Sequence, residues 1–265
     1  MRNRKIGEYI LNRRKIILKN GFAGLTGQII SEFLQFVVRI FTLRYIGVEV
    51  LGISATFTSI LQTLSLTELG FQMAVVYYLY QPLSQHDEKK INQILIILKR
   101  VYEVVGTVFI CISIACIPIL KYILKDIDIT TTVMAYYIIM SMNIACTYFM
   151  AYKRALLLAD QKDYISQTVD CLFNVIISIF KIGVIILFRN YIIFLLLQTI
   201  QTVGANIVIQ LFCKRKYSFL CTSKFEMSIF KSISKDVKNV FMGKLAGYVY
   251  GATDNLIISS FIGAV

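Results

Sequence analysis

One stretch decides the fold: residues 20–47, NGFAGLTGQIISEFLQFVVRIFTLRYIG. It is long and apolar enough to cross a bilayer, which takes about 20 residues. A charge in the middle of a membrane costs roughly 2.5–3.5 kcal/mol on insertion scales, so we expect its polar side to line an interior cavity and not to face lipid. The polar residues recur at steps of three and four, along one side of a helix: Gly24, Gln28, Ser31, Glu32, Gln35, Arg39 and Thr42.

The composition places the chain in a membrane. Its 265 residues are 57% hydrophobic and 16% charged, with two prolines, and the mean hydropathy is +0.69. A soluble domain has about 25% charged residues. These values predict an all-α membrane protein with several spans. The net charge of +13 does not indicate a nucleic-acid partner, because the charges lie between apolar spans and not on one soluble domain.

Five more apolar spans are expected after the first, and several carry a polar stripe of their own. They are residues 51–80, 98–120, 131–152, 165–188 and 191–212. We therefore predict a basic cytoplasmic or interfacial segment at 1–19, a six-helix transmembrane bundle at 20–213, a basic cytoplasmic linker at 214–238, and a truncated second bundle beginning at 239–265. For residues 1–19, a topology anchor is favoured over a short helix lying on the inner leaflet.

The basic residues predict which side faces the cytoplasm. With the amino end inside and the spans alternating, 21 of the 28 Lys and Arg residues fall in cytoplasmic segments and 4 in outer segments. This asymmetry is a strong positive-inside signal. We expect a multi-pass protein whose N-terminus is cytoplasmic.

Metal and disulfide chemistry are not expected. The six cysteines form no Cys-x-x-Cys pair, and most lie within apolar spans, where free Cys packs as a small hydrophobe. The single histidine, His86, lies in a polar loop. We therefore predict neither a metal nor another cofactor.

The end of the chain echoes its first span. At a constant offset of 216 positions, Gly243 corresponds to Gly27 and Gly263 to Gly47. We interpret residues 239–265 as the start of a second copy of the six-helix unit, a parallel repeat of a kind that transporters often contain.

Several short motifs resemble those of one transporter family. They are RYIGVEVLG (44–52), FTSIL (57–61), ELGF (68–71), YYLYQPL (77–83), KKIN (89–92) and TDN (253–255). The set is similar to the polysaccharide repeat-unit (O-antigen or capsule) flippases of the multidrug/oligosaccharidyl-lipid/polysaccharide (MOP) exporter superfamily. The motifs are helix-packing and turn signatures, so they indicate the family better than the substrate.

The resemblance implies two six-helix bundles around a cavity that opens alternately to each side of the bacterial cytoplasmic membrane. Members of this branch move oligosaccharide repeat units linked to polyprenyl diphosphate to the outer leaflet, for surface polysaccharide synthesis. This chain matches the first lobe and one truncated helix of the second. We therefore expect a fragment or a truncated gene product that is inactive without the missing second bundle.

The implied substrate carries an anionic diphosphate, a polar glycan and a polyprenyl tail. Arg39, Lys181 and Lys244 would attract the diphosphate, although each could instead snorkel to the surface, and snorkelling is favoured for Lys244. Glu32 would either bind a coupling proton or hold the first helix to a neighbour. The residues expected to contact sugar hydroxyls are Gln28, Gln35, Asn174 and Gln198.

Three other functions compete with the flippase. A multidrug antiporter of the same superfamily would favour acidic cavity groups, against which Arg39 and Lys181 argue. A membrane glycan polymerase or glycosyltransferase would need a sizeable extramembrane loop, and the outer connections here are short. We therefore do not expect an enzyme. A nonfunctional truncated remnant is the third alternative.

Overall fold

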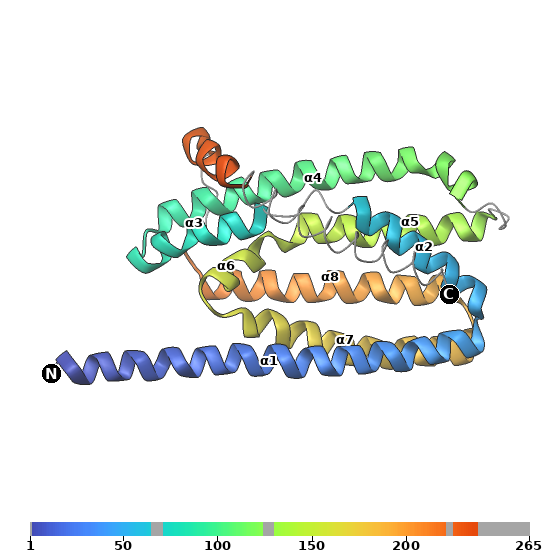
Figure 1. Ribbon diagram of the computed structural model, residues 1–265, viewed down its shortest axis with the longest axis horizontal. Coiled ribbons are helices and arrows are strands. Elements are labelled where there is room, and N and C mark those ends of the chain that lie inside the picture. The colour runs from blue at the N-terminus through green and yellow to red at the C-terminus, as the bar shows by residue number, and fades with distance from the viewer. Residues whose placement is uncertain (1, 65–70, 124–129, 221–224, 238–265) are drawn as a thin grey trace, which may run out of the picture.

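The computed structural model describes residues 2–64, 71–123, 130–220 and 225–237, and the regular structure in these ranges is helical (Figure 1). The helices are α1 (Arg2–Tyr45), α2 (Val48–Leu64), α3 (Phe71–Gln85), α4 (Glu88–Ile123), α5 (Thr131–Met150), α6 (Arg154–Ala159), α7 (Asp163–Phe188) and α8 (Tyr191–Lys216), with a 3₁₀ turn, η2, at Ala151–Lys153. The predicted all-α membrane protein is confirmed.

Five segments of the described chain are long and apolar enough to cross a membrane. They are Asn20–Tyr45, Glu88–Pro118, Thr131–Ala159, Asp163–Phe188 and Tyr191–Lys216. Each corresponds to a predicted span. The α4 helix begins ten residues earlier than the predicted start at residue 98, because Ile91, Ile94, Leu95 and Leu98 recur at helical spacing and are buried.

The predicted span at 51–80 falls on two helices in the described part of the chain. These are α2, which has 17 residues, and α3, which continues to Gln85. Residues 65–70, between them, lie outside the described residues.

The basic amino-terminal segment is not a separate helix. The α1 helix runs without a break from Arg2 to Tyr45, and Figure 1 shows its amino-terminal part continuing beyond the other helices in the same direction. No proline or helix-breaking pair stands between residues 1–19 and the first span, so nothing in the chain stops the helix there.

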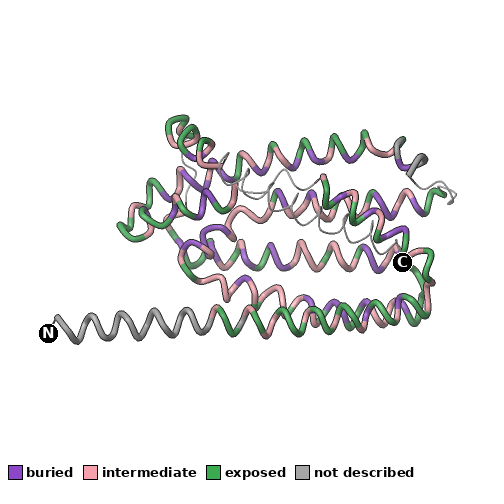
Figure 2. The backbone as a smooth tube through the Cα atoms, viewed as in Figure 1, coloured by how far each residue is buried: buried purple, intermediate pink, exposed green. Residues whose placement is uncertain are grey.

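Two apolar cores stand at opposite ends of the bundle. One joins α3, the start of α4, α6 and the end of α8, around Leu79, Ile97 and Leu156. The other joins α2, α5 and the facing ends of α7 and α8, around Phe57 and Tyr137. Buried positions lie on the inward sides of these helices (Figure 2).

The α1 helix packs along α7 and remains largely exposed elsewhere (Figure 1). Among its described side chains, only Val38 and Thr42 are buried. The two helices approach closely at Gly24, where an added Cβ would lie 2.9 Å from the side-chain oxygen of Gln167. The face of α1 that carries Glu32 and Arg39 is exposed, and this exposure positions the site.

The short turn predicted between two antiparallel spans has the required geometry. Arg189 adopts a left-handed conformation with φ of 48° at the end of α7. Asn190 then caps α8, because its Oδ1 accepts a hydrogen bond from the N–H of Ile192 at 2.9 Å.

Part of the predicted linker at 214–238 is folded onto the bundle. Residues 214–216 complete α8, and residues 227–237 are helical. Ile233 is buried in the first apolar core, and the Tyr78 hydroxyl donates to Asp236 Oδ2 at 2.7 Å. The predicted second bundle at 239–265, including Lys244, lies outside the described residues.

A polar contact ties the turn after α6 to the end of α8. The Tyr217 hydroxyl donates to Asp160 Oδ2 at 2.6 Å, and Lys162 pairs with the same carboxylate. Burial and the hydrogen bond to Asp160 raise the pKa of Tyr217 above its ordinary value. The phenol is therefore protonated, and a donor, throughout the physiological pH range.

Candidate substrate cavity

A cavity of about 780 Å³ opens between α1, α2, α7 and α8. It contains a carboxylate, a guanidinium and an ammonium: Glu32 and Arg39 come from α1, and Lys181 from α7. Amides surround them, namely Gln35, Asn174, Gln198 and Gln201. Its hydroxyl groups are Thr42, Ser54, Thr58, Ser59, Ser178, Tyr191 and Thr202. Four helices thus turn polar stripes toward one space.

Of the nominated residues, seven lie in the described part of the chain, and the structure brings six of them together: Glu32, Gln35, Arg39, Asn174, Lys181 and Gln198. Helical spacing places the nominated residues of each helix on one face of that helix. The packing of α1 against α7, and of α7 against α8, then brings these faces together.

Gln28 is the exception. It lies in a second pocket of about 480 Å³ along the contact between α1 and α7, with Ser31, Gln167 and Asp170. The eleven residues from Gln28 to Arg39 correspond to about 16 Å along a helix. The same stripe therefore reaches past one end of the cavity.

A hydrogen-bonded network holds Lys181 in place. Its Nζ donates to Gln201 Oε1 at 3.1 Å and lies 5.1 Å from the centre of the Phe194 ring. Asn174 Oδ1 accepts from Ser178 Oγ at 3.2 Å and from Gln201 Nε2 at 3.5 Å. Because an ammonium group has three donors, Lys181 retains donors for a ligand.

The two cavity cations are not neutralised by carboxylates of the described chain. Neither Arg39 nor Lys181 is among the residues that form ion pairs there. Glu32 lies seven residues before Arg39, roughly 10 Å along the helix. The cavity thus offers two cationic groups beside one carboxylate, an arrangement that suits an anionic group.

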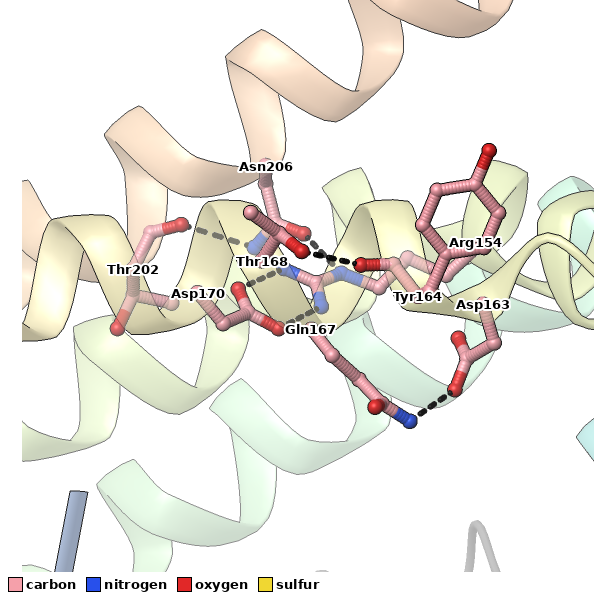
Figure 3. A network of polar contacts seen from close by, with 8 residues as sticks. All are labelled: Arg154, Asp163, Tyr164, Gln167, Thr168, Asp170, Thr202 and Asn206. Carbon is pink, nitrogen blue, oxygen red and sulfur yellow. Dashed lines mark hydrogen bonds and ion pairs between the residues drawn. The ribbon is translucent and has the colours of Figure 1, made fainter. Parts of the chain in front are cut away.

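A different arginine is fully paired. Arg154, at the start of α6, forms two hydrogen bonds of 2.6 and 2.8 Å with the Asp170 carboxylate of α7. Its Nε donates to Asn206 Oδ1 of α8 at 2.8 Å, and Asn206 Nδ2 donates to the Thr202 carbonyl at 2.9 Å. Figure 3 shows this network, which joins three helices.

The family comparison agrees with this architecture. The model of the family described as Polysaccharide biosynthesis protein matches residues 17–265. The chain belongs to this family. It is a polysaccharide flippase of the MOP superfamily, as its motifs indicated. No curated protein and no solved structure matches the flippase chain.

Sequence reasoning missed part of what the flippase structure assembles. Arg154 lies in a basic loop between two predicted spans and Asp170 within the span at 165–188, and the sequence nominates neither as a site residue. Gln201 and Thr202 lie at helical spacing from Gln198, within the span at 191–212. The signal was present in that spacing, but the partner of each residue depends on which helices are neighbours.

We expect Asp170→Asn to lower the stability of the flippase. The substitution removes the charge that accepts both Arg154 bonds, and hydrogen bonds to charged groups contribute about 1.5–3 kcal/mol. The measurement is the thermal unfolding midpoint of the purified full-length protein, beside the level of protein in the membrane. Asp163→Asn is the matched control, since within the described ranges the Asp163 carboxylate accepts only from the neutral amide of Gln167. Equal midpoints for the two variants would contradict a structural role for the Arg154 pair.

Proposed function

We propose that the protein flips oligosaccharide repeat units linked to polyprenyl diphosphate across the bacterial cytoplasmic membrane, by alternating access, for surface polysaccharide synthesis. One observation supports this proposal most strongly: Arg39 and Lys181 share a cavity with amides and hydroxyls, on the open side of an apolar helical bundle. The protein would act as a transporter and not as an enzyme.

The chemistry of the cavity suits the head group of such a lipid. Moving a diphosphate and a glycan through hydrocarbon removes their water, and buried polar groups are costly unless new partners replace it. Arg39 and Lys181 would pair with phosphate oxygens. Gln35, Asn174 and Gln198 would bond to sugar hydroxyls, while the polyprenyl tail remains in lipid. Gln28 would contact the glycan only during the part of the transport cycle in which the head group lies in the second pocket.

We propose that a second helical bundle covers the open side of the cavity. Glu32, Gln35 and Arg39 are exposed on α1, and a charge facing lipid near mid-membrane would cost roughly 2.5–3.5 kcal/mol. Large apolar side chains of the same helix, including Phe33 and Phe36, are 66% and 63% exposed. A surface that mixes charged and apolar side chains suits contact with another protein surface. Without the second bundle, this chain would be inactive. The excess of basic residues in alternate connections supports a cytoplasmic N-terminus.

Glu32 is the candidate coupling residue. It is the only carboxylate among the described residues that line the cavity, and intramembrane carboxylates often carry protons in transporters. The alternative, in which Glu32 holds α1 to a neighbouring helix, has no ion pair in the described chain to support it.

The experiment that tests this function is deletion of the gene for the full-length protein in its bacterial host. The expected result is loss of surface polysaccharide together with accumulation of lipid-linked repeat units on the inner leaflet, both reversed by the restored gene. Normal surface polysaccharide, combined with increased sensitivity to cationic drugs, would instead identify a multidrug antiporter. Normal results in both assays would identify a remnant.

A further inference from the structure

A second compartment adjoins the cavity between α2, α5 and α8. It has a volume of about 320 Å³. Thr58 and Gln198 line both spaces, so the compartment continues from the cavity. The other residues that line it are Leu61, Gln62, Ile139, Met140, Asn143, Ile144, Thr147, Tyr148 and Leu195.

The two spaces differ in charge. Glu32, Arg39 and Lys181 line the cavity, whereas every described residue that lines the compartment is uncharged. Its polar groups are hydroxyls and amides, surrounded by aliphatic side chains. A site of this composition favours a neutral polar ligand over an ion, because nothing in it compensates the lost hydration of a charge.

The compartment presents both acceptors and donors, because the amides of Gln62, Asn143 and Gln198 carry N–H groups beside the threonine oxygens. Thr58 Oγ1 donates its proton to the Ser54 carbonyl at 2.7 Å, and Thr147 Oγ1 donates to the Asn143 carbonyl at 3.2 Å. Each hydroxyl oxygen therefore turns lone pairs toward a ligand. Asn143 Oδ1 is buried and has no hydrogen-bond partner in the described part of the chain.

Mixed donors and acceptors without a charge define the ligand that fits. Sugar hydroxyls both donate and accept, so they can accept from the amide N–H groups of Gln62, Asn143 and Gln198 and donate to the threonine oxygens. A phosphate or carboxylate group carries a charge that no cation lining the compartment balances. The aliphatic walls suit the C–H faces of a sugar ring, as in ligand pockets generally.

We propose that this compartment, around Asn143 and Thr147, binds a neutral sugar residue of the repeat unit, apart from the diphosphate site at Arg39 and Lys181. The proposal rests on the proposed function and adds a position for the glycan. It also predicts an orientation: the diphosphate lies beside α1 and α7, and the sugar extends toward α5.

The test compares two lipid probes on the purified full-length protein in phosphatidylcholine nanodiscs. One probe is polyprenyl diphosphate, and the other is the same lipid carrying a neutral glucosyl-N-acetylglucosamine disaccharide. Two hydrogen bonds at about 1 kcal/mol each lead us to expect that the wild-type protein binds the sugar-bearing lipid about 10- to 30-fold more tightly.

Asn143→Leu is expected to reduce this sugar preference to within about twofold and to leave the affinity for bare polyprenyl diphosphate unchanged. Thr147→Val, which keeps the side-chain shape, is the second variant should the first fail to fold. Ser141→Val is the matched control, because Ser141 lies on the same helix and does not line the compartment.

The outcomes separate the two proposals. Failure of the wild-type protein to bind either lipid contradicts the proposed function. Equal affinity of the wild-type protein for both lipids, or an unchanged sugar preference in Asn143→Leu and Thr147→Val, overturns the sugar compartment alone. A lost preference in both variants but not in Ser141→Val supports it.

Discussion

Replacing Arg39 by alanine in the full-length flippase is expected to lower export of the surface polysaccharide about 10- to 100-fold at normal protein level. The guanidinium lines the cavity from α1 and forms no ion pair in the described chain. A charge-assisted bond to phosphate is worth about 1.5–3 kcal/mol, and each 1.36 kcal/mol is tenfold in rate.

The matched control for Arg39 is Arg44→Ala. Arg44 lies on the same helix, is exposed and does not line the cavity, so export is expected to remain within about twofold. Arg39→Lys is expected to recover part of the activity, since an ammonium keeps the charge but loses the bidentate geometry. Normal export by Arg39→Ala at normal abundance would remove Arg39 from the mechanism.

Lys181→Met is the second substitution with a large expected effect. It keeps the unbranched side chain, one atom shorter, and removes its charge. Lys181 is 8% exposed, and it is held by Gln201 and the Phe194 ring. We expect polysaccharide export by this variant to fall at least tenfold if the Lys181 charge binds the substrate. The reason is that a cation already removed from water pairs strongly with phosphate.

Stability separates this role from a structural one. Burial of a charge is costly, so Lys181→Met is expected to unfold at the same temperature as the wild-type protein or at a higher one. Lys216→Met is the control, since Lys216 also lies over a phenylalanine ring, at 5.4 Å, but stands at the exposed end of α8. A lower unfolding temperature with unchanged export per folded molecule would assign Lys181 to structure alone.

The sequence placed the start of α4 ten residues too late, and the cause is tertiary. Apolar run length predicts the spans, but contacts with other helices extend a helix beyond its apolar run. The α4 helix extends back to Glu88 because Ile91 and Leu95 find partners in α3 and α6.

The sequence by itself determined that this protein is a helical membrane protein, that its polar residues form stripes, and that it resembles the flippase family. These properties depend on composition and on the 3.6-residue period, which are local. Only the tertiary structure decided which stripes meet. It placed Arg39 and Lys181 in one cavity, placed Gln28 in another pocket, and neutralised Arg154 with Asp170. The reason is physical: the period fixes the face that a residue occupies, whereas the neighbour of that face depends on how whole helices pack against one another.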